Sequence, residues 1–225
     1  MELNTVQENV KKIKVQLAAG NPFGDKITLV AATKMQSVET INAAIEAGVD
    51  AVAENRVQEF RDKTDGLLPC PQHFIGHLQT NKVKYLVGKI SLFHSCDRYD
   101  LAEEIARLSV NRGVVSNVLI QVNIGSEISK GGFPLEEAKQ AYERLKAKQG
   151  LRVKGFMAML PADGDASFLA GLADQMRALF EWARAQDKEI EHLSMGMSGD
   201  WKLCVEHGSN MIRVGSTIFG ERNYG

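Results

Sequence analysis

Short apolar runs alternate with helix-like segments along the whole chain, and this alternation restricts the fold more than any other feature. Each run is three to seven residues long, the length of a buried strand. We expect eight strands, at residues 27–33, 51–53, 73–76, 90–93, 118–123, 153–157, 192–195 and 211–214. Helix-like segments lie between them, including one that Ser37 would cap and Gly48 would end, and residues 98–111, 134–148 and 166–186.

Eight strands alternating with helices in 225 residues predict a closed (β/α)8 barrel, or TIM barrel, near the small end of that fold's size range. Apolar positions spaced along residues 4–18 predict an extra N-terminal helix before the first strand. An open doubly wound sheet is the alternative, but it usually carries a glycine-rich fingerprint after its first strand, and residues 33–37 contain no glycine. We find no linker, so we expect one domain over residues 1–225.

Charge and composition exclude several classes of protein. The net charge of -1 gives no general attraction to nucleic acid or to anionic lipid. No apolar run is long enough to span a membrane, and the first residues lack the pattern of a signal peptide. The three cysteines fit neither a zinc site nor a disulfide framework, and no other cluster has metal-ligand spacing. We therefore expect a cytoplasmic protein without a metal.

Lys34 directly follows the first apolar run, where a parallel α/β barrel gathers its chemistry. A neutral lysine amine at such a place can condense with an aldehyde to form a Schiff base. Burial or a cationic neighbour favours the neutral amine that this reaction needs. The alternative is a lysine whose side chain only extends from the strand end into water.

Two stretches near the C-terminus place small residues and hydroxyls just after the last two predicted strands. One contains Ser198, and the other contains Gly215, Ser216 and Thr217. Barrels often bind phosphate with the loops after strands seven and eight, although simple turn and capping chemistry is the alternative. A lysine that faces a phosphate site suggests a phosphorylated aldehyde, and pyridoxal 5'-phosphate (PLP) is the obvious candidate cofactor.

Arg213 lies within the last predicted strand, where a buried charge needs a partner. In a PLP site, an arginine facing the ring nitrogen would keep that nitrogen unprotonated and weaken the ring as an electron sink. A structural ion pair inside the barrel is the alternative.

Further polar residues follow the second, third and fourth predicted strands. Asn55 and His77 are expected near the mouth of the barrel, and Thr80 is a candidate helix N-cap. His77 is a weak candidate, because a lone histidine is more often structural than catalytic, and His94 and Asp97, near the end of the fourth predicted strand, are weaker still.

Seven stretches of the chain resemble the family of pyridoxal phosphate homeostasis proteins, also described as proline-synthetase co-transcribed homologues. The stretches run in order over nearly the whole chain, and the third and the last are long enough to be highly specific. They are residues 30–34, 54–59, 73–82, 119–124, 155–159, 193–198 and 213–220.

The resemblance implies a single barrel like the N-terminal domain of alanine racemases, with PLP held as a Schiff base on Lys34. By motif position it implies that Arg213 faces the pyridine nitrogen and that Asn55 lies close to the cofactor. The phosphate would be held by Ser198, Gly215 and Ser216, with Thr217 as a further contributor. The family is implicated in intracellular vitamin B6 homeostasis and in balanced amino-acid and keto-acid pools, with no established catalytic turnover.

An amino-acid racemase-like PLP enzyme is the alternative function. Two-base racemisation needs a second acid or base opposite the lysine. In the racemases that resemble this barrel, that group is a tyrosine from a second domain of the partner subunit. The chain ends soon after the eighth predicted strand, so we expect no such domain, and its tyrosines fall in predicted helices or in the tail (Tyr85, Tyr99, Tyr142 and Tyr224).

We therefore expect a PLP carrier rather than an enzyme. No heptad seam or exposed apolar stripe stands out, which favours a monomer. PLP-dependent client enzymes are the expected partners, and a scaffold that binds such clients through its surface is a third interpretation.

Four positions depart from the family pattern without removing a presumed cofactor ligand. Ala53 stands where the family usually has glycine, and Gly199 and Trp201 vary a region that is usually more acidic or aliphatic. Cys96 replaces an aliphatic residue, and an exposed thiol there would be oxidisable near the mouth of the barrel.

Overall fold

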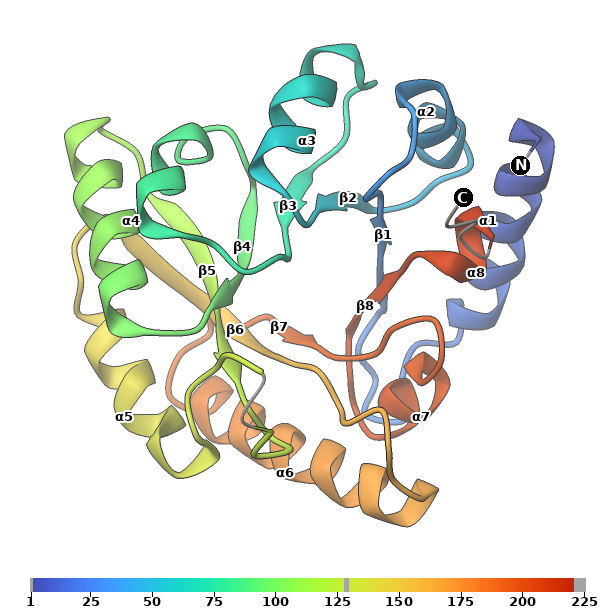
Figure 1. Ribbon diagram of the computed structural model, residues 1–225. Coiled ribbons are helices and arrows are strands. Elements are labelled where there is room, and N and C mark those ends of the chain that lie inside the picture. Colours follow the sequence, from blue (N-terminus) through green and yellow to red (C-terminus); the bar gives the residue numbers. More distant parts are fainter. Residues whose placement is uncertain (1, 128–129, 221–225) are drawn as a thin grey trace.

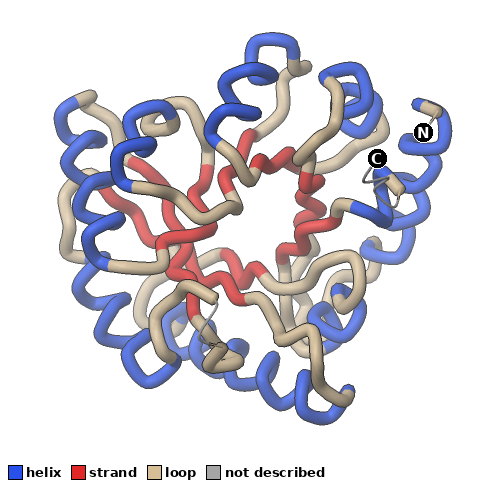
Figure 2. The backbone as a smooth tube through the Cα atoms, viewed as in Figure 1, coloured by secondary structure: helices blue, strands red, loops and turns tan. Residues whose placement is uncertain are grey.

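Eight parallel strands close into one barrel and follow each other around it in chain order (Figures 1 and 2). The computed structural model describes residues 2–127 and 130–220. The last strand pairs with the first, with Thr28 beside Met211, and this pairing closes the sheet. The strands are β1 (Thr28–Ala32), β2 (Ala51–Glu54), β3 (Gln72–Phe74), β4 (Leu92–Cys96), β5 (Ser116–Val122), β6 (Leu151–Ala158), β7 (His192–Ser194) and β8 (Met211–Val214).

Helices follow the strands and form an outer ring around the barrel (Figure 2). This arrangement confirms the predicted (β/α)8 barrel. Among the described residues, no helix is both long and apolar enough to cross a membrane. The α-helices are α1 (Leu3–Leu17), α2 (Val38–Glu46), α3 (Val57–Lys63), α4 (Tyr99–Asn111), α5 (Leu135–Lys146), α6 (Ala166–Arg184), α7 (Trp201–Glu206) and α8 (Ser216–Phe219), and the 3-10 helices are η1 (Thr64–Gly66) and η2 (Thr80–Tyr85).

The predicted extra helix at the N-terminus is present as α1 (Figure 1). Its buried residues, Val6, Val10, Ile13 and Leu17, recur every three or four positions and so share one face. That face belongs to the same apolar cluster as Ile41 of α2 and residues of α8. The helix therefore covers the side of the barrel where β1 meets β8.

The strands are apolar because most of their residues are buried on both faces of the sheet. Leu29 and Ala31 of β1 pack outward in the cluster shared with α1 and α2, whereas Val30 belongs to a separate cluster within the barrel. Small and large side chains fill this interior together: Val30, Ala51, Ala53, Leu92, Leu119, Met157 and Met211. The barrel is thus a packed core, and open space is left at its ends.

Local signals predicted some element boundaries correctly and others not. Ser37 caps α2 as predicted, since its hydroxyl accepts a hydrogen bond from the Thr40 N–H at 3.3 Å. The prediction of Thr80 as a cap was wrong, because Thr80 is the first residue of η2 and Gln79 occupies the cap position without a side-chain bond. β4 extends to Cys96, beyond the predicted residues 90–93, because polar side chains in the extension find partners inside the protein.

Candidate functional site

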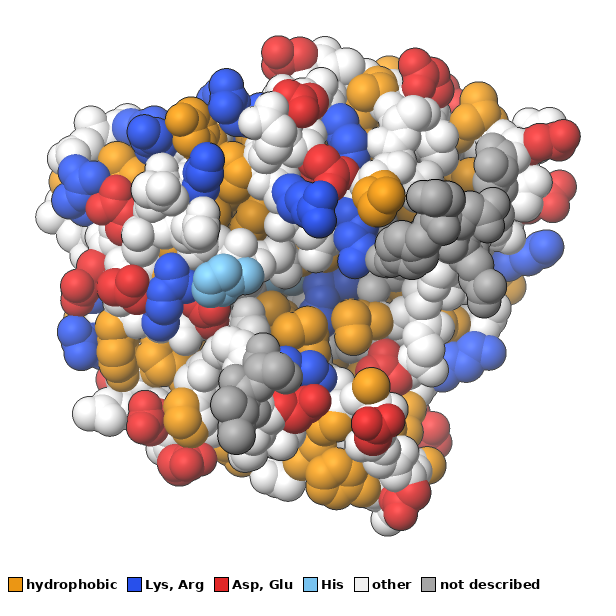
Figure 3. Space-filling view, viewed as in Figure 1, with side chains coloured by type: hydrophobic (Ala, Val, Ile, Leu, Met, Phe, Trp, Pro, Cys, Tyr) orange, Lys and Arg blue, Asp and Glu red, His pale blue; other side chains and the backbone are white. Residues whose placement is uncertain are grey.

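A cavity of about 260 Å³ opens at the carboxyl ends of the strands, in the hollow at the centre of Figure 3. All parallel strands of a barrel end at the same face, so loops far apart in the sequence meet there. Six of the seven cofactor residues predicted from the sequence line this one cavity: Lys34, Asn55, Ser198, Arg213, Gly215 and Ser216.

Lys34 lies two residues beyond the end of β1 and is half-buried. Its amine makes no hydrogen bond or ion pair with any described residue, although it borders a cavity that holds other polar groups. The next residue, Met35, has a φ of 63°, in the left-handed region that non-glycine residues rarely adopt. The turn that presents Lys34 is therefore held by its surroundings rather than by local preference.

A buried network that no sequence pattern indicated holds this turn on both sides of Lys34. The Lys63 ammonium donates to the Glu54 carboxylate at 2.9 Å, to the Glu59 carboxylate at 2.7 Å and to the Thr33 carbonyl at 3.1 Å. Glu59 in turn accepts the Met35 N–H at 2.6 Å, and Glu54 accepts the Thr33 hydroxyl at 2.7 Å. Both neighbours of Lys34 in the chain are thus tied to one charge cluster.

Arg213 is 4% exposed and points into the barrel from β8. Its guanidinium donates to the Ser194 carbonyl at 2.9 Å, to the Ser194 hydroxyl at 2.5 Å and to the Ala158 carbonyl at 3.0 Å. No described carboxylate pairs with it, so the structural ion pair weighed from the sequence is not what satisfies this charge. Burial lowers the pKa of Arg213 to about 10, which leaves it protonated at neutral pH.

Below Arg213, a chain of buried polar side chains runs across the barrel. The Ser194 hydroxyl lies 3.2 Å from His94 Nδ1, and His94 Nε2 lies 3.0 Å from His73 Nδ1. Because a guanidinium can only donate, the Ser194 oxygen accepts from Arg213 and its proton is free to reach His94 Nδ1. His94 then carries its proton on Nε2 and donates it to His73.

Both histidines of this chain are held neutral. Burial lowers the pKa of His73 to about 3, with the nearby His192 contributing. Burial also lowers the pKa of His94 well below its ordinary value, and the charges of His73 and Arg213 act in the same direction. The buried positive charge of Arg213 is therefore compensated by dipoles and carbonyl groups and not by a counter-ion.

The loops after β7 and β8 are joined by one serine. The Ser198 oxygen accepts the Gly215 N–H at 3.2 Å and the Thr217 N–H at 3.3 Å, which leaves its own proton free to donate toward the cavity. Ser216 lines the cavity beside them. Thr217 does not line it and its side chain is exposed, so the structure separates this predicted residue from the other six.

Asn55 is fixed by an unusually close approach of the backbone. A Cβ atom at Gly76 would lie 2.0 Å from the Asn55 carbonyl oxygen, so only glycine fits at this position. The Asn55 side-chain oxygen is buried and has no hydrogen-bond partner among the described residues. A buried acceptor without a partner at the wall of a cavity is the kind of group that a bound molecule satisfies.

The remaining candidates from the sequence lie outside this cavity. His77 is largely exposed, borders two neighbouring hollows and contacts Asp97 at 3.2 Å. Cys96 is fully buried, and burial raises the pKa of its thiol to about 12. The exposure that would make Cys96 oxidisable is therefore not met, and an inaccessible protonated thiol is unreactive.

Five residues that line the cavity were not predicted, and most of them are apolar. Ile75 and Met159 are packed against the apolar cluster inside the barrel. Each of the five lies at the carboxyl end of a strand or in the loop after it, which is the signal that would have found them. They are Ala32, Ile75, Met159, Met197 and Gly199. In the part of the chain that the structure describes, no cluster of three side chains could hold a metal ion.

Comparisons with known proteins show the family of this chain. The sequence profile of the alanine racemase N-terminal domain matches residues 1–223. A pyridoxal phosphate homeostasis protein from Aquifex aeolicus is 37% identical over 225 residues, which cover 99% of this chain and 97% of the relative. Another protein of that name, from Escherichia coli, is 32% identical over 231 residues and covers 99% of both chains.

Solved structures show the same fold. The structure of PipY from Synechococcus elongatus with PLP bound has a TM-score of 0.83 and 29% identity, and the match covers 96% of this chain and 100% of PipY. Alanine racemase from Clostridium difficile has a TM-score of 0.78 at 16% identity, covering 98% of this chain and 56% of the racemase, and it shows the fold alone. The chain thus belongs to the alanine racemase N-terminal domain family and, within it, to the pyridoxal phosphate homeostasis proteins.

Proposed function

We propose that this protein binds PLP on Lys34 and serves in the homeostasis of vitamin B6. One observation carries the proposal: an unpaired lysine amine, a buried arginine and two hydroxyl-bearing loops border a single cavity. PLP presents a matching set of groups, namely an aldehyde, a ring nitrogen and a phosphate. The names of the relatives and the PLP-bound structure of PipY support the same assignment.

Each polar group of the cavity has a role in this proposal. Lys34 would hold the aldehyde group of PLP through its amine, with the loss of one water. Arg213 would donate toward the ring nitrogen and so would leave that nitrogen unprotonated. Ser198 and Ser216 would hold the phosphate through their hydroxyl groups, and Gly215 and Thr217 would contribute through the N–H groups that now donate to the Ser198 oxygen. The Asn55 side-chain oxygen accepts a hydrogen bond from the bound molecule.

The residues of this chain favour a carrier over a racemase. PLP supplies an electron sink when it is bound, but an arginine at its ring nitrogen weakens that sink. A second acid or base is also needed for racemisation. Of the tyrosines, Tyr85, Tyr99 and Tyr142 do not line the Lys34 cavity, and Tyr224 lies outside the described residues. The names of the curated relatives describe a homeostasis protein and not an enzyme.

A spectrum with chemical trapping tests the proposal. Purified protein mixed with PLP should show the absorption band of a Schiff base, and borohydride should fix a pyridoxyl group that peptide mapping locates on Lys34. Lys34→Ala should abolish both signals. Lys26→Ala is the matched control, because Lys26 lies two residues before β1, at its opposite end. Trapping that persists in Lys34→Ala would show that another lysine holds the aldehyde.

Domain organisation, oligomeric state and location in the cell complete the proposal. We infer one domain over residues 1–225 that acts as a cytoplasmic monomer and delivers PLP to client enzymes. Support for a monomer comes from the exposed large apolar side chains, which are scattered over elements such as α1, α4 and α6. The three cysteines are free, as is usual in a reducing compartment. Light scattering coupled to gel filtration measures the oligomeric state, and a mass of about twice 24.8 kDa would contradict the monomer.

A further inference from the structure

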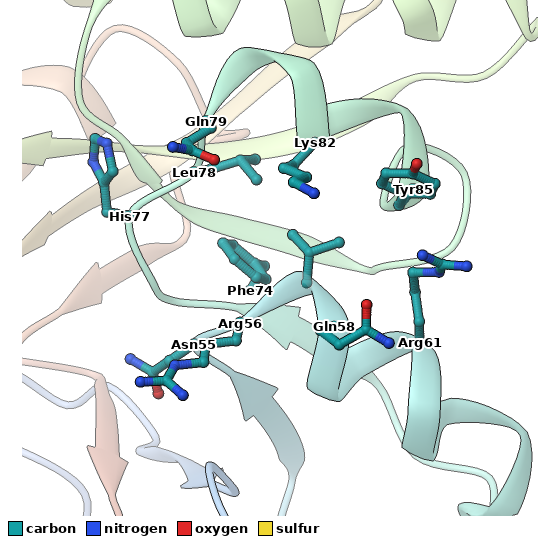
Figure 4. A pocket seen from close by; sticks show the side chains of 11 residues that line it. Asn55, Arg56, Gln58, Arg61, Phe74, His77, Leu78, Gln79, Lys82 and Tyr85 are labelled. Atoms are coloured by element: carbon teal, nitrogen blue, oxygen red, sulfur yellow. The ribbon is translucent and has the colours of Figure 1, made fainter.

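A second cavity, of about 290 Å³, lies between α3 and the 3-10 helix η2 (Figure 4). Its floor is apolar, with Phe74 and Leu78 buried beneath it and Val57 of α3 at its side. Asn55 lines this cavity and the Lys34 cavity alike, so the two adjoin. The volume is near the lower end of the range for sites that bind small molecules.

Positive charge is concentrated around this second cavity. Arg56, Arg61 and Lys82 line it, and no described acidic side chain does. The lining of the cavity is therefore strongly positive, although the whole chain has a net charge of -1. None of the three cations forms an ion pair with a described residue. The two acids of α3 have other hydrogen-bond partners: Glu59 accepts from Lys63 and Asp62 accepts from the Gln58 amide, although the charge of Arg56 still acts on Glu59.

Two of the three cations, Arg61 and Lys82, lie near the aromatic ring of Tyr85, which Lys84 approaches as well. The Arg61 guanidinium lies 4.6 Å from the centre of the Tyr85 ring, and the Lys82 ammonium lies 6.0 Å from it. Figure 4 shows Lys82 from η2 and Arg61 from α3 both pointing into the gap between these helices. A guanidinium that rests on a ring keeps its N–H donors, and its planar face can stack on another flat group.

We propose that this cavity is a second, non-covalent binding site, which takes a phosphorylated planar ring. Lys82 contacts the phosphate, and the ring stacks on the Arg61 guanidinium above the apolar side chain of Val57. Arg56, which extends toward Asn55 in Figure 4, adds positive charge on the side of the Lys34 cavity. A mononucleotide and a phosphorylated form of vitamin B6 share this chemistry. The site needs no lysine adduct, so it stands apart from the function proposed for Lys34.

Equilibrium dialysis with two probes tests the site. Adenosine 5'-monophosphate represents the mononucleotides, and pyridoxine 5'-phosphate represents vitamin B6 without an aldehyde. The binding of each probe is measured on the untreated protein and on protein in which PLP fills the Lys34 cavity and has been fixed there with borohydride. At least one probe should bind the filled protein, one molecule per chain, and the probe that binds identifies the source of the ligand.

Two lysines of η2 give a matched pair of variants. Lys82→Gln removes a cation that lines the cavity and should weaken binding about tenfold, as expected for the loss of a charge-assisted hydrogen bond. Lys84→Gln removes the same charge from the same helix. Lys84 lies 5.3 Å from the centre of the Tyr85 ring but does not itself line the cavity, so this change should weaken binding less than about twofold. The proposal is overturned if neither probe binds the filled protein, or if both variants weaken binding equally, as general charge attraction would.

Discussion

The buried histidines make the folded protein sensitive to mild acid in a way that can be calculated. His73 has an ordinary pKa of 6.5 that burial lowers to about 3 in the folded state. Between these values the unfolded chain binds a proton that the folded protein does not, so the free energy of unfolding falls as the pH falls. The full shift corresponds to about 5 kcal/mol, of which about 2 kcal/mol is lost between pH 7.5 and pH 5.

The perturbation is His73→Gln, which removes the titrating group but keeps an acceptor for the His94 Nε2 proton. Urea unfolding of the cofactor-free protein, followed by the fluorescence of Trp182 and Trp201, gives the free energy of unfolding at each pH. We expect the loss between about pH 7.5 and about pH 5 to be smaller in the variant by about 2 kcal/mol. Part of the loss should remain, because the pKa of His94 is lowered in the same direction.

Three features of this experiment isolate His73. The lower pH stays above the ordinary pKa of Asp and Glu, so most carboxylates contribute little. Burial raises the pKa of Glu54, which has the opposite effect on the pH dependence, but that contribution is common to both proteins and cancels in the comparison. His77→Gln serves as the control, because its side chain is 68% exposed. Equal losses in the wild type and in His73→Gln would refute the argument that His73 is buried in its neutral form.

Three further predictions concern other parts of the molecule. Arg213→Glu should allow the PLP ring nitrogen to be protonated and should shift the absorption band of the bound cofactor, whereas an unchanged spectrum in a folded variant would contradict the role of Arg213. In the urea assay, Gly76→Ala should lower the free energy of unfolding by about 2 kcal/mol or more, because the new methyl group would lie 2.0 Å from the Asn55 carbonyl oxygen. Gly171→Ala in α6 is the control. A Cβ there meets nothing within 4 Å, so this change should be neutral or stabilising. Cys96 should react with a thiol reagent only after unfolding, whereas the half-buried Cys70 should react in the folded protein, and early labelling of Cys96 would show that β4 opens readily.

The positions of Lys34, Asn55, Ser198 and Arg213 could be predicted from the sequence because each lies at or near the carboxyl end of a strand. In a parallel barrel all such ends share one face, so strand order places these residues near one another. The distinction between Ser216, which lines the cavity, and Thr217, which does not, could not be predicted. It depends on which way each side chain points from the short helix α8. The apolar pattern of the preceding strand does not specify these directions.

Burial of polar side chains was the other feature that sequence patterns did not reveal. Cys96 and His94 lie on a strand whose predicted end fell short of them, since the prediction followed apolar residues only. Their environment is set by partners from other strands, such as Ser194 on β7 and His73 on β3. The second cavity likewise forms where α3 and η2 face each other, and neither helix indicates it alone.

The sequence by itself determined the barrel, its N-terminal helix and the face that carries the Lys34 cavity. These follow from local periodicity and from the alternation of strands with helices along the chain, which makes neighbouring strands parallel. The tertiary structure alone decided that Arg213 is satisfied by Ser194 and Ala158 rather than by a carboxylate, and that the Lys63 network holds the turn of Lys34. The physical reason is that such contacts depend on the register and closure of the barrel, which bring together side chains that no local pattern relates.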